Sequence, residues 1–373
     1  MKKICRISLK MFTMVCVLVL LTGCWDALEI EKRNVLTTLI VDKKDGNYYY
    51  YTEIANLSRN NSSQSENQKK TGFSILIGEG KTFTEARDHY DLKSLNKVFL
   101  GGGRMLIFTD RMAKNGIEEY INRARGEIDY RKSILLATTS NDPMEILNNV
   151  PENAASVGFA IETNLKSSVA SGALFDINIG DVLQVLAVKK AGFLVPDIKI
   201  SKDKLAVSGY TVFNNDAKSI GIISADDRKG VGYILNSNAI FSYDIGQSNN
   251  KYGTKVILKS KKITPTYSEG QLTLNMDINF NANIDISKKM ESMDQKTQEI
   301  IKSKLEEQTK TDVEHAVHVS QEFKCDYLGI YKYFRAVDPD KFVKTDWSDV
   351  YSKAKVNVST HVNISQTQIV VMS

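Results

Sequence analysis

The chain has 373 residues, of which 42% are hydrophobic and 25% charged, and its formal net charge is +5 at pH 7. Residues 1–23 carry four cations and no acid, so without them Lys+Arg falls from 49 to 45 against 44 Asp+Glu. This near balance, with no basic stripe interleaved with aromatics, excludes a nucleic-acid partner. The length predicts two or three domains.

The first 24 residues have the organisation of an export signal that ends in a cysteine. A basic segment precedes an apolar run at residues 11–21, which is about half as long as a bilayer-spanning helix. Leu21, Thr22 and Gly23 then form a lipobox in front of Cys24. We expect a lipoprotein signal peptide over residues 1–23, cleavage between Gly23 and Cys24, and a diacylglyceryl group on the Cys24 sulfur.

Two acyl chains, such as palmitate, satisfy the two-signal requirement for stable membrane anchoring. A plain secretion signal with a chance cysteine at position 24 is the alternative. Cys5 and Cys16 leave with the signal, so Cys325 is the one free thiol that remains and no intramolecular disulfide can form. The exported chain must therefore be held together by its own apolar cores.

The N-terminal half alternates between strand and helix patterns. A β-branched run at 35–41, an Asp45-Gly46 turn and a second strand at 48–57 predict a hairpin. Thirteen polar residues at 58–70 then predict a disordered loop. The remaining expected strands are 98–100, 105–109 and 134–138. Three helices are expected to begin at the caps Thr82, Asp110 and Asp142. Two more are expected over 154–165 and 179–188. Residues 190–203 break the pattern and predict a boundary, so we expect an N-terminal α/β domain over 24–195.

The C-terminal half has mainly antiparallel patterns. A hairpin at 205–223 and a short helix from Ser224 predict a small middle domain over 204–262. A C-terminal α/β domain is expected over 263–373, with an alternating strand at 272–280, a long helix at 292–323, an aromatic helix at 326–334 and a closing strand at 356–364. Trp347 is expected to fill the edge of its core. The fold class is therefore α+β: several domains of mixed sheets with flanking helices, largely antiparallel in the C-terminal half.

No catalytic or metal-binding constellation emerges from the sequence. His315 and His318 lie at i and i+3 without the third ligand of a zinc site, which favours solvated helix-face histidines. Gly101-Gly102-Gly103 lacks the Lys-Ser/Thr of a phosphate loop and favours a tight turn. Cys325 has no feature of a reactive thiolate. We expect neither an enzyme nor a cofactor.

Five segments together resemble one known family. They are Gly23-Cys24-Trp25-Asp26, the helix start Gly80-Lys81-Thr82-Phe83, the strand Arg104-Met105-Leu106-Ile107-Phe108, the hairpin strand from Leu205 to Phe213, and the closing block Asp326-Tyr327-Leu328-Gly329-Ile330 with Trp347. In these segments the chain resembles the Ger(x)C lipoproteins, the C subunits of spore-germination nutrient receptors. The likeness runs almost from end to end.

The resemblance implies a non-enzymatic subunit of a nutrient germinant receptor, needed for nutrient-triggered spore germination. It implies a lipid anchor on the outer face of the spore inner membrane, integral-membrane A and B subunits as partners, and three mixed α/β domains in a row. Two other classes of lipid-anchored protein have different requirements. A solute-binding lipoprotein of an importer would require two similar βαβ lobes, and a lipid-anchored cell-wall hydrolase would require paired carboxylates or a metal.

Overall fold

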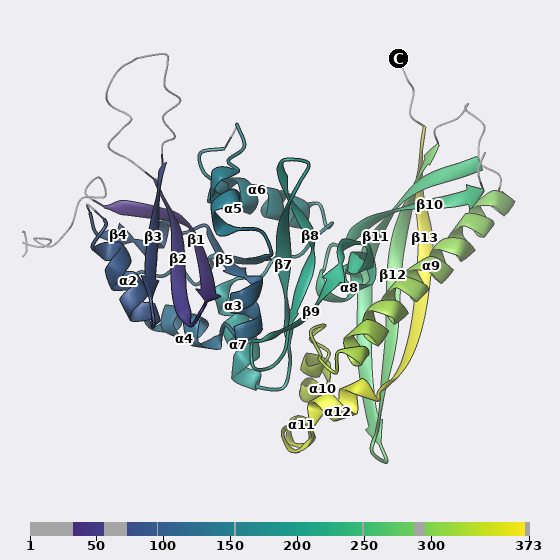
Figure 1. Ribbon diagram of the computed structural model, residues 1–373. Helices are drawn as coiled ribbons and strands as arrows, with labels where there is room; N and C mark the ends of the chain where they lie inside the picture. The colour runs from purple at the N-terminus through teal and green to yellow at the C-terminus, as the bar shows by residue number, and fades with distance from the viewer. Residues whose placement is uncertain are drawn as a thin grey trace, which may run out of the picture.

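The computed structural model describes residues 33–55, 73–94, 96–152, 154–247, 250–286 and 295–369. Within these ranges the strands form two mixed sheets with flanking helices, which confirms the expected α+β class (Figure 1). The lipobox with Cys24 and the polar segment 58–70 lie outside the described residues. The two sheets are called the first and the second sheet below.

The first sheet is built from the N-terminal half of the chain and has a parallel centre. β1, β5, β6 and β7 run parallel to one another, whereas β2, β3, β8 and β9 pair antiparallel. In spatial order the strands are β3 (Phe73–Gly80), β2 (Asn47–Ala55), β1 (Asn34–Lys44), β5 (Met105–Thr109), β6 (Leu135–Thr139), β7 (Phe193–Ser201), β8 (Lys204–Phe213) and β9 (Ser219–Ser224), with β4 (Val98–Phe99) paired to the start of β1.

Helices cover both faces of the first sheet, so its central strands are apolar on both sides. On one face pack α2 (Phe83–Asp91), α3 (Asp110–Asn115), α4 (Glu118–Gly126) and α7 (Ile179–Val188). On the other face pack α5 (Pro143–Asn148) and α6 (Val157–Ala170). This arrangement explains the continuous burial of β1 from Leu36 to Val41, where no polar and apolar alternation appears.

The local start signals largely gave the right helix ends. Thr82 caps α2 by accepting from the backbone N–H of Glu85, and Asp142 caps α5 with Pro143 in the first turn. The expected cap at Asp110 was wrong by one residue, because the Thr109 hydroxyl accepts from the N–H of Met112 and Asp110 already lies in α3. The Asp45-Gly46 turn has φ angles of 51° and 82°, which confirms the hairpin between β1 and β2.

The second sheet comes from the C-terminal half. Its order is β10 (Ile240–Gln247), β11 (Asn250–Ser268), β12 (Gln271–Ile286) and β13 (Lys355–Ile369); the first three are antiparallel and β13 runs parallel to β12. The expected alternation in β12 is confirmed, since every second side chain from Leu272 to Phe280 is buried. The long helix α9 (Gln295–Glu322) lies across one face of this sheet, as Figure 1 shows.

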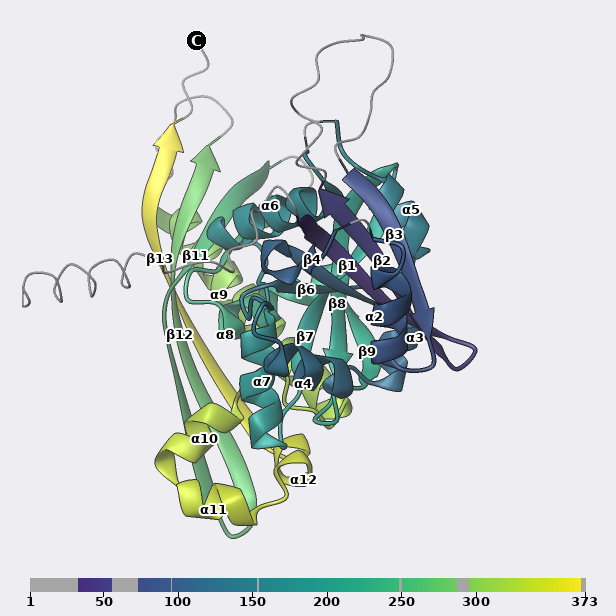
Figure 2. The same ribbon diagram turned by 90° about the vertical axis from the view of Figure 1, so that its left-hand side faces the viewer.

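Short helices complete the second sheet's core. They are α8 (Arg228–Leu235), α10 (Tyr331–Val337), α11 (Pro339–Lys344) and α12 (Trp347–Ser352). Figure 2 shows α10, α11 and α12 gathered at one end of the long strands, beside the unit built on the first sheet. The expected helix at 326–334 was wrong in its first turn. Gly329 has a φ of 72°, and the Asp326 carboxylate caps the backbone N–H groups of Ile330 and Tyr331, so the helix begins at Tyr331.

Two features of the first sheet had no counterpart in the sequence reading. β3 is an edge strand at 73–80, and β7 runs through the break around Pro196. The residues expected to form a middle domain divide between the sheets, because β8 and β9 join the first sheet whereas β10 and β11 join the second. The division of the chain into domains at 195, 204 and 262 stays a prediction.

Candidate functional site

The residues singled out in the sequence are not brought together into one site. Leu21, Thr22, Gly23 and Cys24 lie outside the described residues. His315 and His318 lie exposed on α9, where His315 Nε2 is 3.2 Å from Asp227 Oδ1. Cys325 is buried against Gly192 and Phe213, and burial raises the pKa of its thiol to about 12, so the sulfur stays protonated at neutral pH.

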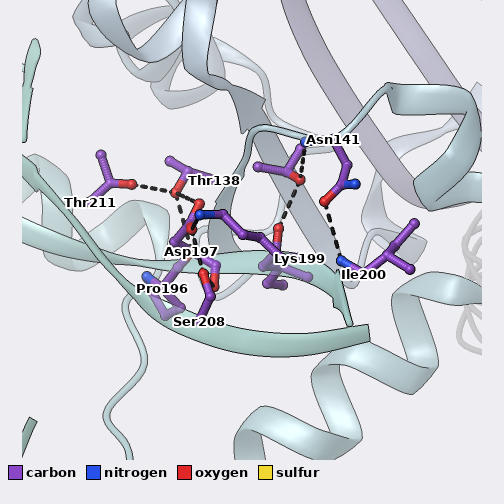
Figure 3. A network of polar contacts seen from close by, with 10 residues as sticks. Thr138, Asn141, Pro196, Asp197, Lys199, Ile200, Ser208 and Thr211 are labelled. Atoms are coloured by element: carbon purple, nitrogen blue, oxygen red, sulfur yellow. Dashed lines mark hydrogen bonds and ion pairs between the residues drawn. The ribbon is translucent and has the colours of Figure 1, made fainter. Parts of the chain in front are cut away.

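A polar network lies where the parallel strands of the first sheet end. The buried Asp197 carboxylate on β7 accepts from the Ser208 hydroxyl at 2.6 Å and from the Thr138 hydroxyl at 3.3 Å, and Lys199 Nζ lies 3.4 Å from it (Figure 3). The hydroxyls of Thr138 and Thr211 are 2.6 Å apart. The carboxyl ends of parallel strands are the usual position of ligand sites in open α/β sheets, which makes this network the first candidate.

The network holds two strands together. β6 and β7 pair at a single register position, Thr138 opposite Asp197. Side chains supply the remaining links: the Thr139 hydroxyl donates to the carbonyl of Ile198 at 2.8 Å, and the Asn141 side-chain oxygen accepts from the N–H of Ile200 at 3.2 Å (Figure 3). Both oxygens of Asp197 already have partners, so its carboxylate is a structural acceptor.

A second buried carboxylate lies at the same edge, on β1. Asp42 accepts from the Thr109 hydroxyl and the Lys43 backbone N–H, and Arg111 Nη2 lies 2.5 Å from its Oδ2. Burial opposes ionisation of Asp42, but the bonds from Arg111 and Thr109 outweigh it and hold the pKa of this carboxyl below its usual value. The neighbouring Asp110 differs, because burial and the charge of Asp197 raise its pKa.

A third carboxylate, Glu53, is fully buried at the start of α6. It accepts from the hydroxyls of Thr37 and Thr38 and from the backbone N–H groups of Val157 and Gly158, at 2.6 to 3.3 Å. An anion at a helix N-terminus satisfies N–H groups that have no partner within the helix. Gly158 permits this approach, since a Cβ there would lie 2.5 Å from the Thr38 hydroxyl.

Two clefts lie at the junction of the two sheets. One, of about 330 Å³, is lined by Asp176, Gln184 and Lys332 among others. Burial raises the pKa of Asp176. The other, of about 370 Å³, is lined by Lys189, Lys324 and Lys190 among others. Lys190 Nζ donates to the carbonyls of Phe342, Val343 and Thr345 at 2.7 to 2.8 Å, so this cation fastens the end of α11 to the start of β7.

The junction is completed by the Asp326 and Trp347 pair. Trp347 is 1% exposed, which confirms its expected burial, and its indole Nε1 donates to Asp326 Oδ2 at 3.0 Å. Burial raises the pKa of Asp326 to about 6, although the N–H groups of Tyr331 and Ile330 favour the charged form. The carbonyl of Asp326 accepts from the N–H of Gly192 at 3.2 Å, so the same segment ties the second core to the first sheet.

These groups bind one another, and their arrangement positions strands and helices. In the described ranges no three or more His, Cys, Asp or Glu side chains are grouped so as to hold a metal ion. Nor does any helix in that part of the chain combine the length and apolar character needed to cross a bilayer. The sequence reading missed the carboxylates Asp42, Glu53 and Asp197. The available signal was that Asp42 directly follows the buried run of β1.

Comparison with known families decides the assignment. The family description "Spore germination protein N-terminal domain" matches residues 26–200, and "Spore germination B3/ GerAC like, C-terminal" matches residues 208–368. The chain belongs to the GerAC family of spore germination proteins. Both halves of the family are therefore present, which agrees with a resemblance that runs almost from end to end.

Relatives in Bacillus subtilis (strain 168) extend over most of the chain. Spore germination protein KC is 20% identical over 386 residues, covering 94% of this chain and 93% of the relative. Spore germination protein B3 is 22% identical over 371 residues, covering 92% and 94%. The crystal structure of the GerBC protein aligns with a TM-score of 0.56 at 14% identity, covering 87% of this chain and 96% of that one, and shows that the fold is shared.

Proposed function

We propose that this GerAC family member is a lipid-anchored, non-enzymatic subunit of a nutrient germinant receptor. In this proposal Cys24 carries the diacylglyceryl group and holds the chain on the outer face of the spore inner membrane. The integral-membrane A and B subunits of the receptor are its partners. The observation that carries the proposal is the match of both GerAC family halves over residues 26–200 and 208–368.

Three buried carboxylates of the N-terminal half have structural partners, which agrees with a non-enzymatic subunit. The buried carboxylates Asp42, Glu53 and Asp197 are engaged by hydroxyls, cations or backbone N–H groups of the chain itself. A hydrolytic or transfer site needs an acid, base or nucleophile that is free to meet a substrate. The importer-type alternative gains no support, since the second sheet is mainly antiparallel and does not repeat the first.

Replacement of the anchor cysteine tests the proposal. In the producing cell, Cys24→Ala should abolish incorporation of an alkyne-labelled fatty acid. The chain should then stay unprocessed or be released from the membrane, because the apolar run at residues 11–21 is too short to span a bilayer. Cys16→Ala is the matched control, since it removes a cysteine from the same signal and should leave labelling unchanged. Spores of the Cys24→Ala strain should respond weakly to nutrients.

Two results would count against the proposal. Equal fatty-acid labelling of the Cys24→Ala chain would place the lipid elsewhere. The receptor role would be wrong if two results were found together for a chain that carries lipid on Cys24. The chain would not co-purify with the A and B subunits from detergent-solubilised spore membranes, and its deletion would not affect nutrient germination.

A further inference from the structure

The two most exposed large hydrophobic side chains of the described residues lie at the ends of neighbouring helices. Ile128 is 99% exposed just after α4, and Leu92 is 87% exposed at the C-terminal end of α2. Neither belongs to a hydrophobic core cluster. Single exposed aliphatics are ordinary, but two at nearly full exposure on adjacent elements form the kind of surface that meets another phase or partner.

The two helices place these side chains on one rim of the first sheet. Arg123 on α4 donates to Thr84 at the start of α2 at 3.0 Å, and Tyr90 and Tyr130 line the same small cavity between the helices. The helices then end at the edge where the parallel strands begin, because α2 leads into β4 beside the start of β1, and α4 leads into β6. Figure 2 turns α2, α4 and β4 toward the viewer. We call residues 92–94, 96–97 and 125–133 the amino-edge rim.

The amino-edge rim carries more cations than acids. Its exposed basic side chains are Lys93, Lys97, Arg125 and Arg131. Its own acids are Glu127, which lies 3.8 Å from Arg123, and the exposed Asp129. Beside the rim, Asp91 is paired with Arg87 at 3.1 Å. Asp88 on α2 is a further exposed acid one turn before the rim. Exposed aliphatic side chains surrounded by lysine and arginine are the chemistry that suits an anionic bilayer surface.

The first described residues of the chain lie at this rim. Asn34, next to the first described residue, donates through its side chain to Ser94 at 2.7 Å, and its backbone N–H donates to the carbonyl of Lys97 at 3.1 Å. Only the nine residues 25–33 separate Cys24 from this point. A segment of that length spans at most about 30 Å. An acyl group on Cys24 therefore keeps the bilayer within this distance of Arg33, and the neighbouring Asn34 contacts the rim.

We propose that the amino-edge rim is a membrane-contact surface that lies on anionic phospholipid, with Leu92 and Ile128 inserted among the headgroups and the surrounding cations on the lipid phosphates. The tether argument rests on the acylation of Cys24 proposed above, whereas the exposure and charge of the rim do not. Contact along this rim fixes the orientation of both sheets relative to the bilayer and leaves α10, α11 and α12 free for other contacts.

A second exposed pair provides a matched control. Val337 and Val343 on α10 and α11 are 67% and 72% exposed and have Lys341 and Lys344 beside them. This pair offers similar chemistry but belongs to the second core, away from the point where the chain enters. If aliphatic exposure and positive charge alone drove lipid binding, both surfaces would bind.

The test measures co-sedimentation with lipid vesicles. It uses the non-acylated chain 24–373, in which Cys24→Ser prevents lipid attachment. Binding should be measured on phosphatidylcholine alone and on an equimolar mixture of phosphatidylcholine and phosphatidylglycerol. We expect binding to the mixture alone, weakened by salt because exposed charges are screened. Lys97→Glu with Arg131→Glu should lower the partition coefficient about fivefold or more for each charge, and Leu92→Asp with Ile128→Asp should abolish binding. Val337→Asp with Val343→Asp should leave it unchanged.

A site-specific measurement reads the orientation directly. A polarity-sensitive dye on Ile128→Cys should shift to the blue on anionic vesicles, and the same dye on Val337→Cys should not. Cys325 does not interfere, since it is buried. All these positions are exposed, so the variants should melt like the parent chain.

Three outcomes would overturn the inference: no binding of the parent chain to anionic vesicles, equal binding after Leu92→Asp with Ile128→Asp, or loss caused by the α10 and α11 variants. None of these outcomes bears on acylation, which the fatty-acid labelling of Cys24 reports separately. Conversely, the chain could bind anionic vesicles through the rim without being acylated in the cell. In that case the proposed anchor is wrong and the contact surface is supported.

Discussion

At the scale of single residues, the decisive feature of the second core is a buried carboxylate with a tryptophan as its partner. Asp326 and Trp347 are both almost fully buried, and the indole of Trp347 stacks with Phe334 and Tyr351 at centroid distances of 5.4 and 5.7 Å. The aromatic rings supply apolar contact, and the indole N–H supplies one of the hydrogen bonds that Asp326 needs inside a low-dielectric core.

Trp347→Ala should lower the free energy of unfolding by about 3 to 5 kcal/mol, because it removes a large buried side chain and one donor to Asp326. Chemical denaturation of the purified chain measures this. Val343→Ala is the surface control, since Val343 is 72% exposed and should change stability by less than about 0.5 kcal/mol. A Trp347→Ala chain that melts like the parent but no longer co-purifies with membrane subunits would make Trp347 a recognition residue.

Asp326 should also give the fold a measurable pH dependence. Burial raises its pKa from 3.8 to about 6, so the folded chain holds this proton more tightly than the unfolded chain. The stabilising contribution of the protonated group is fully present below pH 3.8 and is lost as the pH rises through about 6.

The measurement compares the parent chain with Asp326→Asn. The difference in free energy of unfolding, parent minus variant, should fall by about 2 kcal/mol between pH 4 and pH 7. Other titrating groups contribute equally to both chains and cancel in this difference. Parallel pH profiles for the two chains would show that the fold does not raise the pKa of Asp326.

At the scale of elements, the close crossing of two helices depends on a glycine. α8 crosses α9 at Gly230, where an added Cβ would lie 1.9 Å from the carbonyl oxygen of Asp312 and 2.9 Å from the Cβ of Ala316. Beside this crossing, Lys261 Nζ donates to backbone carbonyls at the C-terminal end of α8, including Tyr233 and Asn236. The helix is thus fixed by close packing on one side and by a capping cation at its end.

Gly230→Ala should destabilise the chain by about 1 to 3 kcal/mol, because the two helix backbones must separate to accept the methyl group. Gly126→Ala is the matched control: a Cβ at Gly126, the last residue of α4, would have no neighbour within 4 Å. That substitution should be neutral or stabilising by up to about 1 kcal/mol. Equal melting temperatures for the two variants would contradict the close-contact explanation.

At the scale of the whole molecule, the two cores are joined where β7 begins. An added Cβ at Gly192 would lie 2.2 Å from Cys325 Sγ and 2.2 Å from the carbonyl oxygen of Phe213. Lys190 binds the end of α11 a few residues earlier. Segments more than 130 residues apart in the chain thus meet at residues 190–192. We therefore expect a substitution at this junction to weaken the contact between the two cores.

Gly192→Ala should expose Cys325. In the parent chain the thiol is 6% exposed and reacts only when the junction opens. A strained junction opens more often, so we expect the rate of maleimide labelling of Cys325 to rise about tenfold or more. Gly126→Ala is again the control. A labelling rate that does not change in the Gly192→Ala chain would show that the junction tolerates the methyl group.

The sequence by itself determined the features that depend on neighbouring residues. The Asp45-Gly46 turn, the caps Thr82 and Asp142, and the alternation in β12 each follow from local hydrogen bonding or from the period of a strand. The family assignment also came from short segments such as residues 326–330, and the family comparisons confirm it. The lipobox remains a prediction from its own spacing.

Only the tertiary structure decided what depends on residues far apart in the chain. β7 crosses the Pro196 break because its neighbours β6 and β8 hold it in the sheet, and no local pattern encodes those neighbours. Burial of Asp197 and Asp326 likewise requires partners 11 to 59 residues away, which satisfy carboxylates that the sequence alone places on the surface. The amino-edge rim belongs to the same class, since Leu92 and Ile128 become one surface only when α2 and α4 pack on the same face of a sheet.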